Sequence, residues 1–431
     1  MVNVEHIQEG SIRGRVTKAH KPKGSTRLLD YVHSIRSKQR VSQEEKEGTM
    51  ASINHDVEGL LDRLISFSSH SLHQIDLEKY FLIVKELGKG GYGKVVLAKD
   101  RKTDHRMALK VMDKNRTSQQ SFLLEFSISF LLSSHPNIIG CCGTAFTTTD
   151  HFVFVQELAP VGDLFSLILP NVGIPEDAVK RCTVQISSAL EFIAEKGLVH
   201  MDMKPENILV FDRECHCIKL TDFGFARIKG TVIRTKVGSI SFMAPEMCTT
   251  TMSDGLAIDG SLDVWAFGVL IYCLLTGESP WQVAMTDDKE YKCFVDWQNS
   301  FKTYSPPEAW SKVPTGIRRM FIDLLAIDST KRSPSVEVLK YISESWKEEI
   351  PDSATRNEDE NPIQSSSSVQ PGESLPKASN LNTSQSSDSN TSTLSNMSCL
   401  LSTEISGSQT EMTPGPQKDN MAETPIMFDD K

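Results

Sequence analysis

The sequence predicts an α+β protein with two lobes, a small strand-rich lobe followed by a larger helical one. Between residues 80 and 158, short segments with alternating or β-branched character surround a cluster of glycines. Beyond Gly162, apolar residues recur at spacings of three and four, which indicates helices. One of these segments, VWAFGVLIYCLLTG, is apolar on every side, as expected of the central helix of a lobe.

The small lobe is predicted to begin with two strands over residues 80–100, joined by a glycine-rich turn. RMALKVMDK, residues 106–114, is predicted to form a third strand. SQQSFLLEFSISFLLSS, residues 118–134, follows as a helix. HFVFVQEL, residues 151–158, has the β-branched and aromatic bias of a further strand.

The large lobe is predicted to open with a helix over residues 175–197. Pro175 suits its first turn and Gly197 its end. Five apolar residues fall on one face of this helix, at spacings of three and four: Val179, Cys182, Ile186, Leu190 and Ile193.

The two ends of the chain are predicted to be poorly ordered. Residues 1–57 form a basic extension, with ten Lys/Arg against six Asp/Glu in the first 50 residues, and Met50 is an alternative start site. Residues 58–75 have the pattern of a short amphipathic helix, within a lead-in that reaches residue 79. Residues 351–431 carry four Lys/Arg, twelve Asp/Glu and one aromatic residue. Such a Ser/Thr-rich acidic tail buries too little apolar surface to offset the entropy of ordering it.

Charge and composition exclude several classes of protein. The net charge is −10, and removing +4 for the first 50 residues and −8 for the tail leaves −6 on the centre. That centre lacks the basic surface expected of a nucleic-acid-binding domain. The longest apolar run is too short to cross a bilayer. The nine cysteines are not spaced as the two pairs of ligands that a zinc site needs, and this favours reduced thiols. We expect a soluble cytoplasmic or nuclear protein, monomeric and without a membrane or nucleic-acid partner.

GKGGYG, residues 88–93, matches the pattern GxGxxG. The match alone is weak, because dinucleotide-binding folds share it. Here the loop joins two strands instead of opening a helix, which favours a loop that covers the phosphates of a nucleotide. The predicted nucleotide-binding residues in and around the loop are Leu87, Gly88, Gly90, Gly91, Gly93 and Val95.

Lys110, in MALK, is predicted to pair with the α- and β-phosphates, with Glu125 on the following helix holding it in place. A solvated strand lysine is the simpler alternative for Lys110 taken alone.

LVHMDMKPENILV, residues 198–210, carries the predicted chemistry. Asp202 is expected to accept or orient the proton of a substrate hydroxyl, and Lys204 to neutralise the transferring phosphoryl group. Asn207 and the aspartate of the later DFG, Asp222, are expected to hold a Mg²⁺ ion. A triphosphate in a loose transition state needs positive charge on its oxygens and an aligned nucleophile, so ATP and Mg²⁺ are the predicted cofactors.

Three further motifs follow in order. APE ends at Glu246, DVWAFG begins with Asp263, and DSTKRS contains Arg332, the predicted ion-pair partner of Glu246. Each motif taken singly could be an ordinary surface charge or a turn. All of them in this order cannot be explained in that way.

The ordered set resembles eukaryotic protein kinases over residues 80–346, and Lys204 resembles the serine/threonine branch. Longer runs, including GIPEDAVKRC and DGLAID, are similar to the SH3-binding-domain kinase family. The resemblance implies the bilobal protein-kinase fold, ATP–Mg²⁺ in the cleft, and protein substrates that carry Ser or Thr. The alternatives are a pseudokinase scaffold and a small-molecule phosphotransferase, the latter disfavoured by the APE segment.

The resemblance also implies how adenine is held. Glu157 and Ala159 correspond to the hinge contacts, Gln156 to the gatekeeper, and Ala108 and Leu209 to the pair that sandwiches the ring. The family's name implies proline-rich ligands for SH3 domains, but no two prolines lie three apart in this chain. Without a PxxP motif, that partner is not expected.

The chain departs from the kinase pattern at two positions of interest. Met201 replaces the arginine that receives an activation-loop phosphate in many kinases, so we predict that phosphorylation of Thr235 is not the main switch. Ser129 replaces a bulky residue expected to stack on Phe223, unless Ile128 or Phe130 fills the space. Ser239 replaces a common threonine and keeps a hydroxyl able to bond Asp202 or Lys204.

Overall fold

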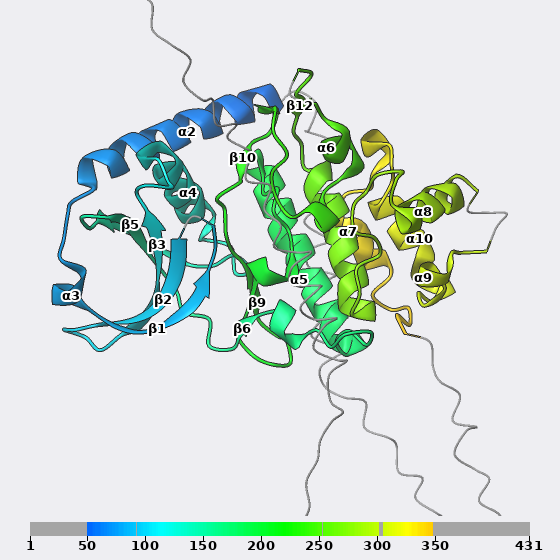
Figure 1. The fold of residues 1–431 in the computed structure, drawn as a ribbon, viewed down its shortest axis with the longest axis horizontal. Coiled ribbons are helices and arrows are strands. Elements are labelled where there is room, and N and C mark those ends of the chain that lie inside the picture. Colours follow the sequence, from blue (N-terminus) through cyan, green and yellow to red (C-terminus); the bar gives the residue numbers. More distant parts are fainter. Residues whose placement is uncertain (1–49, 92, 252, 301–304, 348–431) are drawn as a thin grey trace, which may run out of the picture.

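The computed structural model describes residues 50–347 except 92, 252 and 301–304. The predictions for residues 1–49 and 351–431 therefore lie outside the described residues. Two lobes are visible, a strand-rich N-lobe and a helical C-lobe (Figure 1). The N-lobe elements are α2 (Met50–Ser71), α3 (Leu77–Tyr80), β1 (Phe81–Lys89), β2 (Gly93–Asp100), β3 (Arg106–Asp113), α4 (Gln119–Leu132), β4 (Cys141–Thr147) and β5 (His151–Gln156).

The N-lobe sheet is antiparallel with strand order β1-β2-β3-β5-β4. Val95 is paired with Lys110, and Lys110 with Phe154, so these side chains share one face of the sheet. Helix α4 packs on the same face, where Phe122 and Phe126 join Phe154 in one buried cluster. A residue on the inner side of α4 can therefore reach the side chain of Lys110.

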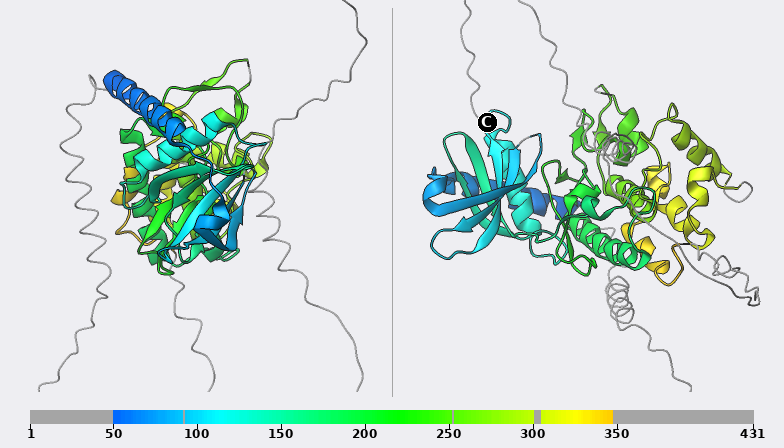
Figure 2. Two further views of the ribbon diagram at one scale, coloured as in Figure 1. Left: turned by 90° about the vertical axis from the view of Figure 1, so that its left-hand side faces the viewer. Right: turned by 60° about the horizontal axis from the view of Figure 1, so that its bottom comes forward.

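The strands and helix predicted for this lobe are present, and two details differ. Strand β4 was not predicted, because its sequence CCGTAFT lacks the alternation that marks a half-buried strand. Helix α2 begins at Met50, eight residues before the predicted start, and ends at Ser71. It lies along α4 in both views of the ribbon (Figures 1 and 2).

The C-lobe is mostly helical and is built around α7. Helix α7 packs against α5 and α10, and all its residues from Leu262 to Thr276 are buried, as its apolar sequence predicts. The helices are α5 (Glu176–Glu195), α6 (Pro245–Thr249), α7 (Ser261–Thr276), α8 (Lys289–Asn299), α9 (Glu308–Ser311) and α10 (Thr315–Leu324). The strands are β6 (Gly162–Asp163), β7 (Leu198–Val199), β8 (Ile208–Val210), β9 (Ile218–Leu220), β10 (Arg227–Ile228), β11 (Val232–Ile233) and β12 (Leu256–Ala257). The 3₁₀ turns are η1 (Phe165–Leu167), η2 (Pro205–Asn207), η3 (Ile240–Phe242), η4 (Ser329–Lys331) and η5 (Ser335–Lys340).

Helix α5 follows its prediction closely. Pro175 is its N-cap residue, and the five apolar residues assigned to one face are all buried. Within residues 50–347 as described, no helix combines the length and the hydrophobicity needed to cross a bilayer.

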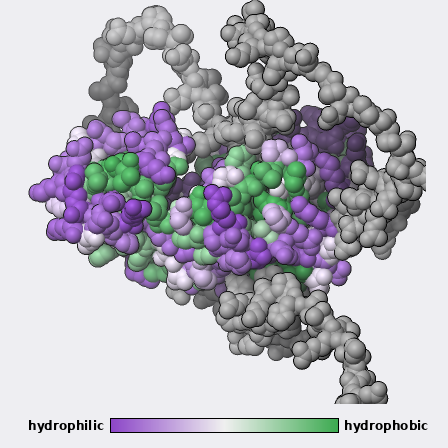
Figure 3. Space-filling model, turned by 90° about the horizontal axis from the view of Figure 1, so that it is seen from below, coloured by the Kyte–Doolittle hydropathy of each residue, from purple (hydrophilic) through white to green (hydrophobic). Residues whose placement is uncertain are grey.

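Apolar side chains are exposed on both lobes in the view from below (Figure 3). On the N-lobe, the exposed large apolar residues of β1 are Leu82, Ile83, Val84 and Leu87. Glycine-rich backbone follows Leu87, so one end of this apolar strand leads directly into the predicted phosphate loop.

Candidate active site

Three charged side chains from three different elements meet between the lobes. Lys110 Nζ, on β3, lies 2.5 Å from Glu125 Oε1 on α4. The same nitrogen lies 2.8 Å from Oδ1 of Asp222, which precedes β10. The ion pair predicted between Lys110 and Glu125 is therefore present, and it includes the DFG aspartate.

The charges of this cluster stabilise one another. Burial alone lowers the pKa of the Lys110 ammonium, but Asp222 and Glu125 outweigh it and raise the pKa above its usual value. Burial opposes ionisation of Asp222, yet Lys110 lowers the pKa of that carboxyl to about 2. Burial raises the pKa of Glu125, with Lys110 opposing. Asp222 is therefore ionised at neutral pH, and its side chain is 43% exposed, so its carboxylate is accessible to a cation.

A second cluster surrounds Asp202 in the segment before and within η2. Ser239 Oγ donates to Asp202 Oδ1 over 3.0 Å and accepts from Lys204 Nζ over 2.9 Å. Lys204 Nζ also lies 3.1 Å from Asp202 Oδ2. The Ser239 hydroxyl was expected to bond Asp202 or Lys204, and it bonds both, which fixes the Asp202 carboxylate beside the Lys204 ammonium.

Asn207 completes this cluster. Its Nδ2 donates to the Asp202 carbonyl over 2.8 Å and to Asp202 Oδ2 over 2.9 Å. Because the amide nitrogen makes both bonds, the amide oxygen Oδ1 is the atom that Asn207 can offer to a cation. Asn207 and Asp222 are the residues whose side-chain oxygens could hold a Mg²⁺ ion, and that metal site stays a prediction.

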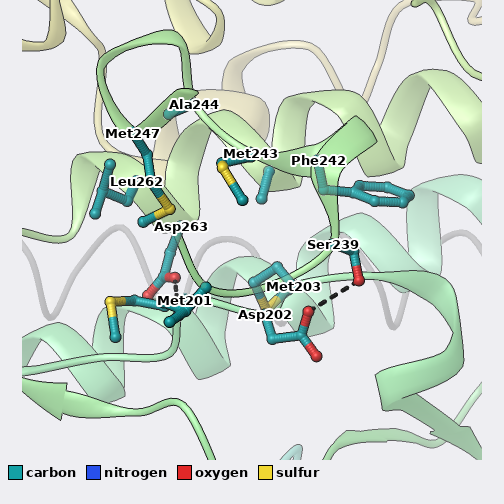
Figure 4. Close-up of a pocket in the computed structure, with 12 residues that line it drawn as sticks. Met201, Asp202, Met203, Ser239, Phe242, Met243, Ala244, Met247, Leu262 and Asp263 are labelled. Atoms are coloured by element: carbon teal, nitrogen blue, oxygen red, sulfur yellow. Dashed lines mark hydrogen bonds between the residues drawn. The ribbon is translucent and has the colours of Figure 1, made fainter. Parts of the chain in front are cut away.

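The backbone around Asp202 is held by Asp263, at the start of α7. The two carboxylate oxygens of Asp263 accept from the backbone N–H groups of His200, over 2.7 Å, and Met201, over 2.8 Å. Met201 has a φ of +64°, a conformation that is unfavourable for a methionine and needs such support. Figure 4 shows the Asp263 and Ser239 bonds on two sides of a small pocket lined by Met201, Met203 and Met243. The sequence marked Asp263 as part of a motif but gave no indication of this role.

Gly238 lies against the same turn. Its φ is +93°, and a Cβ atom at this position would come within 2.4 Å of the Met201 carbonyl oxygen. Glycine is therefore required here for two reasons, its backbone conformation and the close approach of another backbone.

The DFG segment is held by packing and by one arginine. Phe223 is fully buried, with its ring edge against His200 at a centroid distance of 5.1 Å. Ile128 of α4 is buried in the same cluster as Phe223. Phe130 is 43% exposed, so Ile128 is the neighbour that supplies apolar bulk near the buried Ser129.

Arg227, which begins β10, contributes further hydrogen bonds. Its Nη1 donates to the carbonyls of Gly224, over 3.1 Å, and Ala226, over 2.7 Å. The guanidinium is therefore directed to the backbone that follows Asp222. No pattern in the sequence signals this contact of Arg227.

The glycine-rich loop between β1 and β2 has room for a ligand. Cβ atoms built at Gly88 and Gly90 would meet nothing within 4 Å, whereas Gly93 packs against the backbone of β3. The carbonyl of Gly91 accepts from Arg116 over 3.0 Å, and Leu87 is exposed at the start of the loop. The open space beside Gly88 and Gly90 would allow phosphate groups to approach the backbone of the loop.

The residues assigned to the adenine ring come from both lobes. Val95 and Ala108 lie on the sheet face of Lys110, and Leu209 is on β8 of the C-lobe. The hinge follows β5, where the Glu157 N–H donates to the Gly140 carbonyl over 2.9 Å. Among the described residues, neither the Glu157 carbonyl nor the Ala159 N–H has a backbone partner, so both suit hydrogen bonds to a base.

The side chain of Glu157 has a separate role that the sequence did not indicate. Its Oε1 accepts from the Gly140 N–H over 2.6 Å and lies 2.5 Å from Lys219 Nζ. The hinge is thereby tied to β9 in the C-lobe.

The predicted ion pair of the C-lobe is also present. Arg332 donates two bonds to Glu246, over 2.8 and 3.1 Å, and a third to the Ser261 carbonyl over 2.8 Å. The guanidinium carbon lies 5.1 Å from the ring centroid of Trp265. These contacts fasten the APE segment to the start of α7, which also carries Asp263.

The protein kinase domain family model matches residues 81–342. The chain belongs to the protein kinase family. It is 45% identical to serine/threonine-protein kinase SBK1 of Danio rerio over 287 residues, which are 67% of this chain and 74% of the relative. Identity to SBK1 of Mus musculus is 43% over 291 residues, 68% of this chain and 70% of the relative. Identity to SBK2 of Homo sapiens is 36% over 290 residues, 67% of this chain and 83% of the relative. The predicted resemblance to the SH3-binding-domain kinases is thus confirmed.

Proposed function

We propose that this protein is an active serine/threonine protein kinase that transfers the γ-phosphoryl group of ATP to Ser or Thr hydroxyls of protein substrates, with Mg²⁺ as cofactor. The observation that carries the proposal is the assembly of two clusters. Lys110, Glu125 and Asp222 meet in one, and Asp202 and Lys204 meet in the other. The relatives' names and the family match support protein phosphorylation.

Each side chain has a role consistent with its surroundings. Lys110 would bind α- and β-phosphate oxygens, and Asn207 and Asp222 would hold Mg²⁺, which supplies charge neutralisation to the phosphates when bound. Burial lowers the pKa of Lys204, but Asp202 outweighs it and raises the pKa, so Lys204 remains a cation beside the transferring group. Asp202, fixed by Ser239, would accept the hydroxyl proton of the substrate.

The pseudokinase alternative requires a missing or misplaced catalytic group. The structure supports the enzyme instead, because the groups assigned to phosphate binding, metal binding and proton transfer lie within two clusters. The residue before Asp222 joins them, since the Thr221 N–H donates to the Asn207 carbonyl over 2.9 Å. Met201, which departs from the pattern, contributes a backbone hydrogen bond to Asp263 and no catalytic group.

The decisive experiment is transfer of labelled phosphate from ATP to generic Ser/Thr substrates by the purified full chain. We expect Asp202→Asn to lower turnover by about 10²–10⁴. Asp254→Asn, at an exposed position, is the matched control and should behave as wild type. Equal, background-level signals from wild type and Asp202→Asn would favour the scaffold.

We further propose that activation does not depend mainly on phosphorylation of Thr235. Met201 is buried in the C-lobe core and offers no charge, and Arg227 donates to the backbone of the DFG segment. An arginine–phosphate pair brings hydrogen bonds of roughly 1.5–3 kcal/mol each, about a 10- to 150-fold shift in population. This chain lacks the arginine for such a pair at residue 201.

The test compares Thr235→Ala with wild type in the same assay. We expect activity to change by less than about tenfold, the low end of that shift. A larger loss, restored by Thr235→Glu, would contradict the proposal. Met201→Arg should make activity sensitive to phosphatase treatment, whereas wild type should not respond.

A further inference from the structure

Helix α4 carries apolar residues on different sides, so packing against one surface cannot bury them all. Phe122 and Phe126 pack toward the sheet with Phe154. Ile128 and Leu132 belong instead to the large cluster that extends into the C-lobe. A helix that is apolar all round is stable only when it is covered on opposite sides. The sheet covers one side of α4, and α2 lies along another (Figures 1 and 2).

Helix α2 presents a single apolar stripe to this surface. The apolar residues that recur along it at spacings of four are Val57, Leu61 and Ile65, and Leu72 follows directly after the helix ends; all four are buried or half-buried. Phe67, on the other side of the helix, is 72% exposed. Such one-sidedness indicates that α2 is shaped to dock on its own chain.

The stripe touches both lobes. Val57 and Leu61 belong to the same buried cluster as Phe223. Ile65, one turn after Leu61, and Leu72, just past the end of the helix, pack against the N-lobe cluster that contains Phe122 and Phe126. Helix α2 also contacts β10, the strand that begins with Arg227.

The C-terminal end of α2 is fixed to the N-lobe sheet. The Thr147 N–H donates to the His73 carbonyl over 2.9 Å, and the Ile75 N–H donates to the Thr147 carbonyl over 2.8 Å. These bonds attach the segment after α2 to the end of β4. With one end fixed in this way, the packing of the other end against α4 and β10 resists movement of α4 away from the C-lobe.

We propose that α2 is a built-in strut that holds α4 where Glu125 meets Lys110, with Leu61 as a positioning residue that acts through α4. This rests on the proposed function and names a regulation of the same site. The strut orders α4 and β10 by apolar packing within the chain. It thereby supplies the order that an arginine–phosphate pair would otherwise bring to the segment after Asp222.

The test uses the full chain with Leu61→Ala, which shortens the side chain at a position only 2% exposed. If α4 is released, Lys110 loses its carboxylate partner for part of the time. We expect KM for ATP to rise and kcat to fall, with kcat/KM lower by about tenfold, within the usual range of coupling between sites. Amide hydrogen exchange should quicken across α4 and β10 but not across α7. Leu61→Met, which conserves volume, should restore both readouts.

Two controls separate positioning from general stability. Phe67→Ala lies on the exposed face of the same helix and should keep kcat/KM within about twofold of wild type. Leu324→Ala removes a comparable buried side chain from α10 in the C-lobe. It should lower the melting temperature without a selective rise in KM for ATP or faster exchange in α4.

The outcomes are distinct. The proposal is overturned if Leu61→Ala matches Phe67→Ala in both kcat/KM and α4 exchange, or if Leu324→Ala reproduces its full pattern. Should wild type itself transfer no phosphate, the proposed function fails. The strut is then judged on α4 exchange alone, which requires no activity.

Discussion

The Arg332 and Lys110 ion pairs of this protein are held in very different ways. Arg332 binds Glu246 with two parallel hydrogen bonds, binds a backbone carbonyl with a third, and lies over Trp265. Lys110 is a point charge shared between Glu125 and Asp222, which come from separate elements. The first pair sits inside one lobe, whereas the second exists only while α4 and the DFG segment are both in place. A bidentate arginine–carboxylate pair suits a contact that stays formed, whereas a lysine ammonium shared by two carboxylates suits a contact that can form and break.

The largest expected effect tests the Arg332–Glu246 ion pair. Arg332→Met leaves the Glu246 carboxylate without its partner, and breaking a buried pair in this way costs about 3–5 kcal/mol. For a domain of this size the melting temperature should fall by roughly 6–20 °C. Lys331→Met, next in sequence and mostly exposed, is the control and should change it little. An Arg332→Met protein as stable as the control would remove the contrast between the two pairs.

Lys110→Met tests the shared lysine contact and should act on function more than on stability. We expect turnover to fall by about 10²–10³, as when one preorganised electrostatic group is removed. Burial already raises the pKa of Glu125, so without Lys110 this carboxyl can take up a proton and avoid a buried charge. The melting temperature should therefore fall less than in Arg332→Met. Scanning calorimetry beside the transfer assay measures both quantities.

Gly238→Ala tests whether the turn at Met201 and Asp202 is held as rigidly as the Arg332–Glu246 ion pair. The added Cβ would meet the Met201 carbonyl at 2.4 Å, so the turn must shift and displace Asp202. We expect activity to fall by about 10²-fold, the size of effect that a misplacement of about 1 Å can have. Gly230→Ala is a matched control, because Gly230 also has positive φ but has open space around its Cβ position. Equal activity of the two variants would show that the turn yields without consequence.

Ser129→Ala should have the smallest effect. It tests the packing of α4 near the DFG segment, on which the Lys110 contact depends. The Ser129 hydroxyl is buried and, among the described residues, has no hydrogen-bond partner. Removing it should stabilise the protein by about 1 kcal/mol, or roughly 2–4 °C in melting temperature. Turnover should stay unchanged if Ile128 already fills the space beside Phe223. A drop in stability on thermal unfolding would indicate a partner for the hydroxyl.

The sequence predicted those features whose chemistry demands a specific partner. Arg332 and Glu246 are 86 residues apart, yet their pairing could be predicted, because a buried charge needs its opposite. Ser239 could be placed beside Asp202 or Lys204 because the resemblance to kinases implies a hydroxyl at that position. The strands around the glycine loop were marked by alternation and turn residues.

Other features depend on packing that no local pattern records. The choice between Ile128 and Phe130 beside the DFG segment depends on how α4 is rotated, and α2 has a part in setting that. The start of α2 was missed by eight residues because its first turns, MASINHD, lack the apolar periodicity that marks a helix in the sequence. The direction of Arg227 depends on the path of β10, which two residues of sequence cannot specify.

The covering of α4 by α2 also bears on how this protein is handled in the laboratory. A fragment cut at the limits of the family match, residues 81–342, would lack α2 and would expose the apolar surface of α4 that α2 covers. A contiguous apolar surface of that kind favours self-association and poor recovery on expression. The smallest well-behaved unit is therefore expected to begin upstream of the recognisable kinase homology, at a residue that retains the whole of α2.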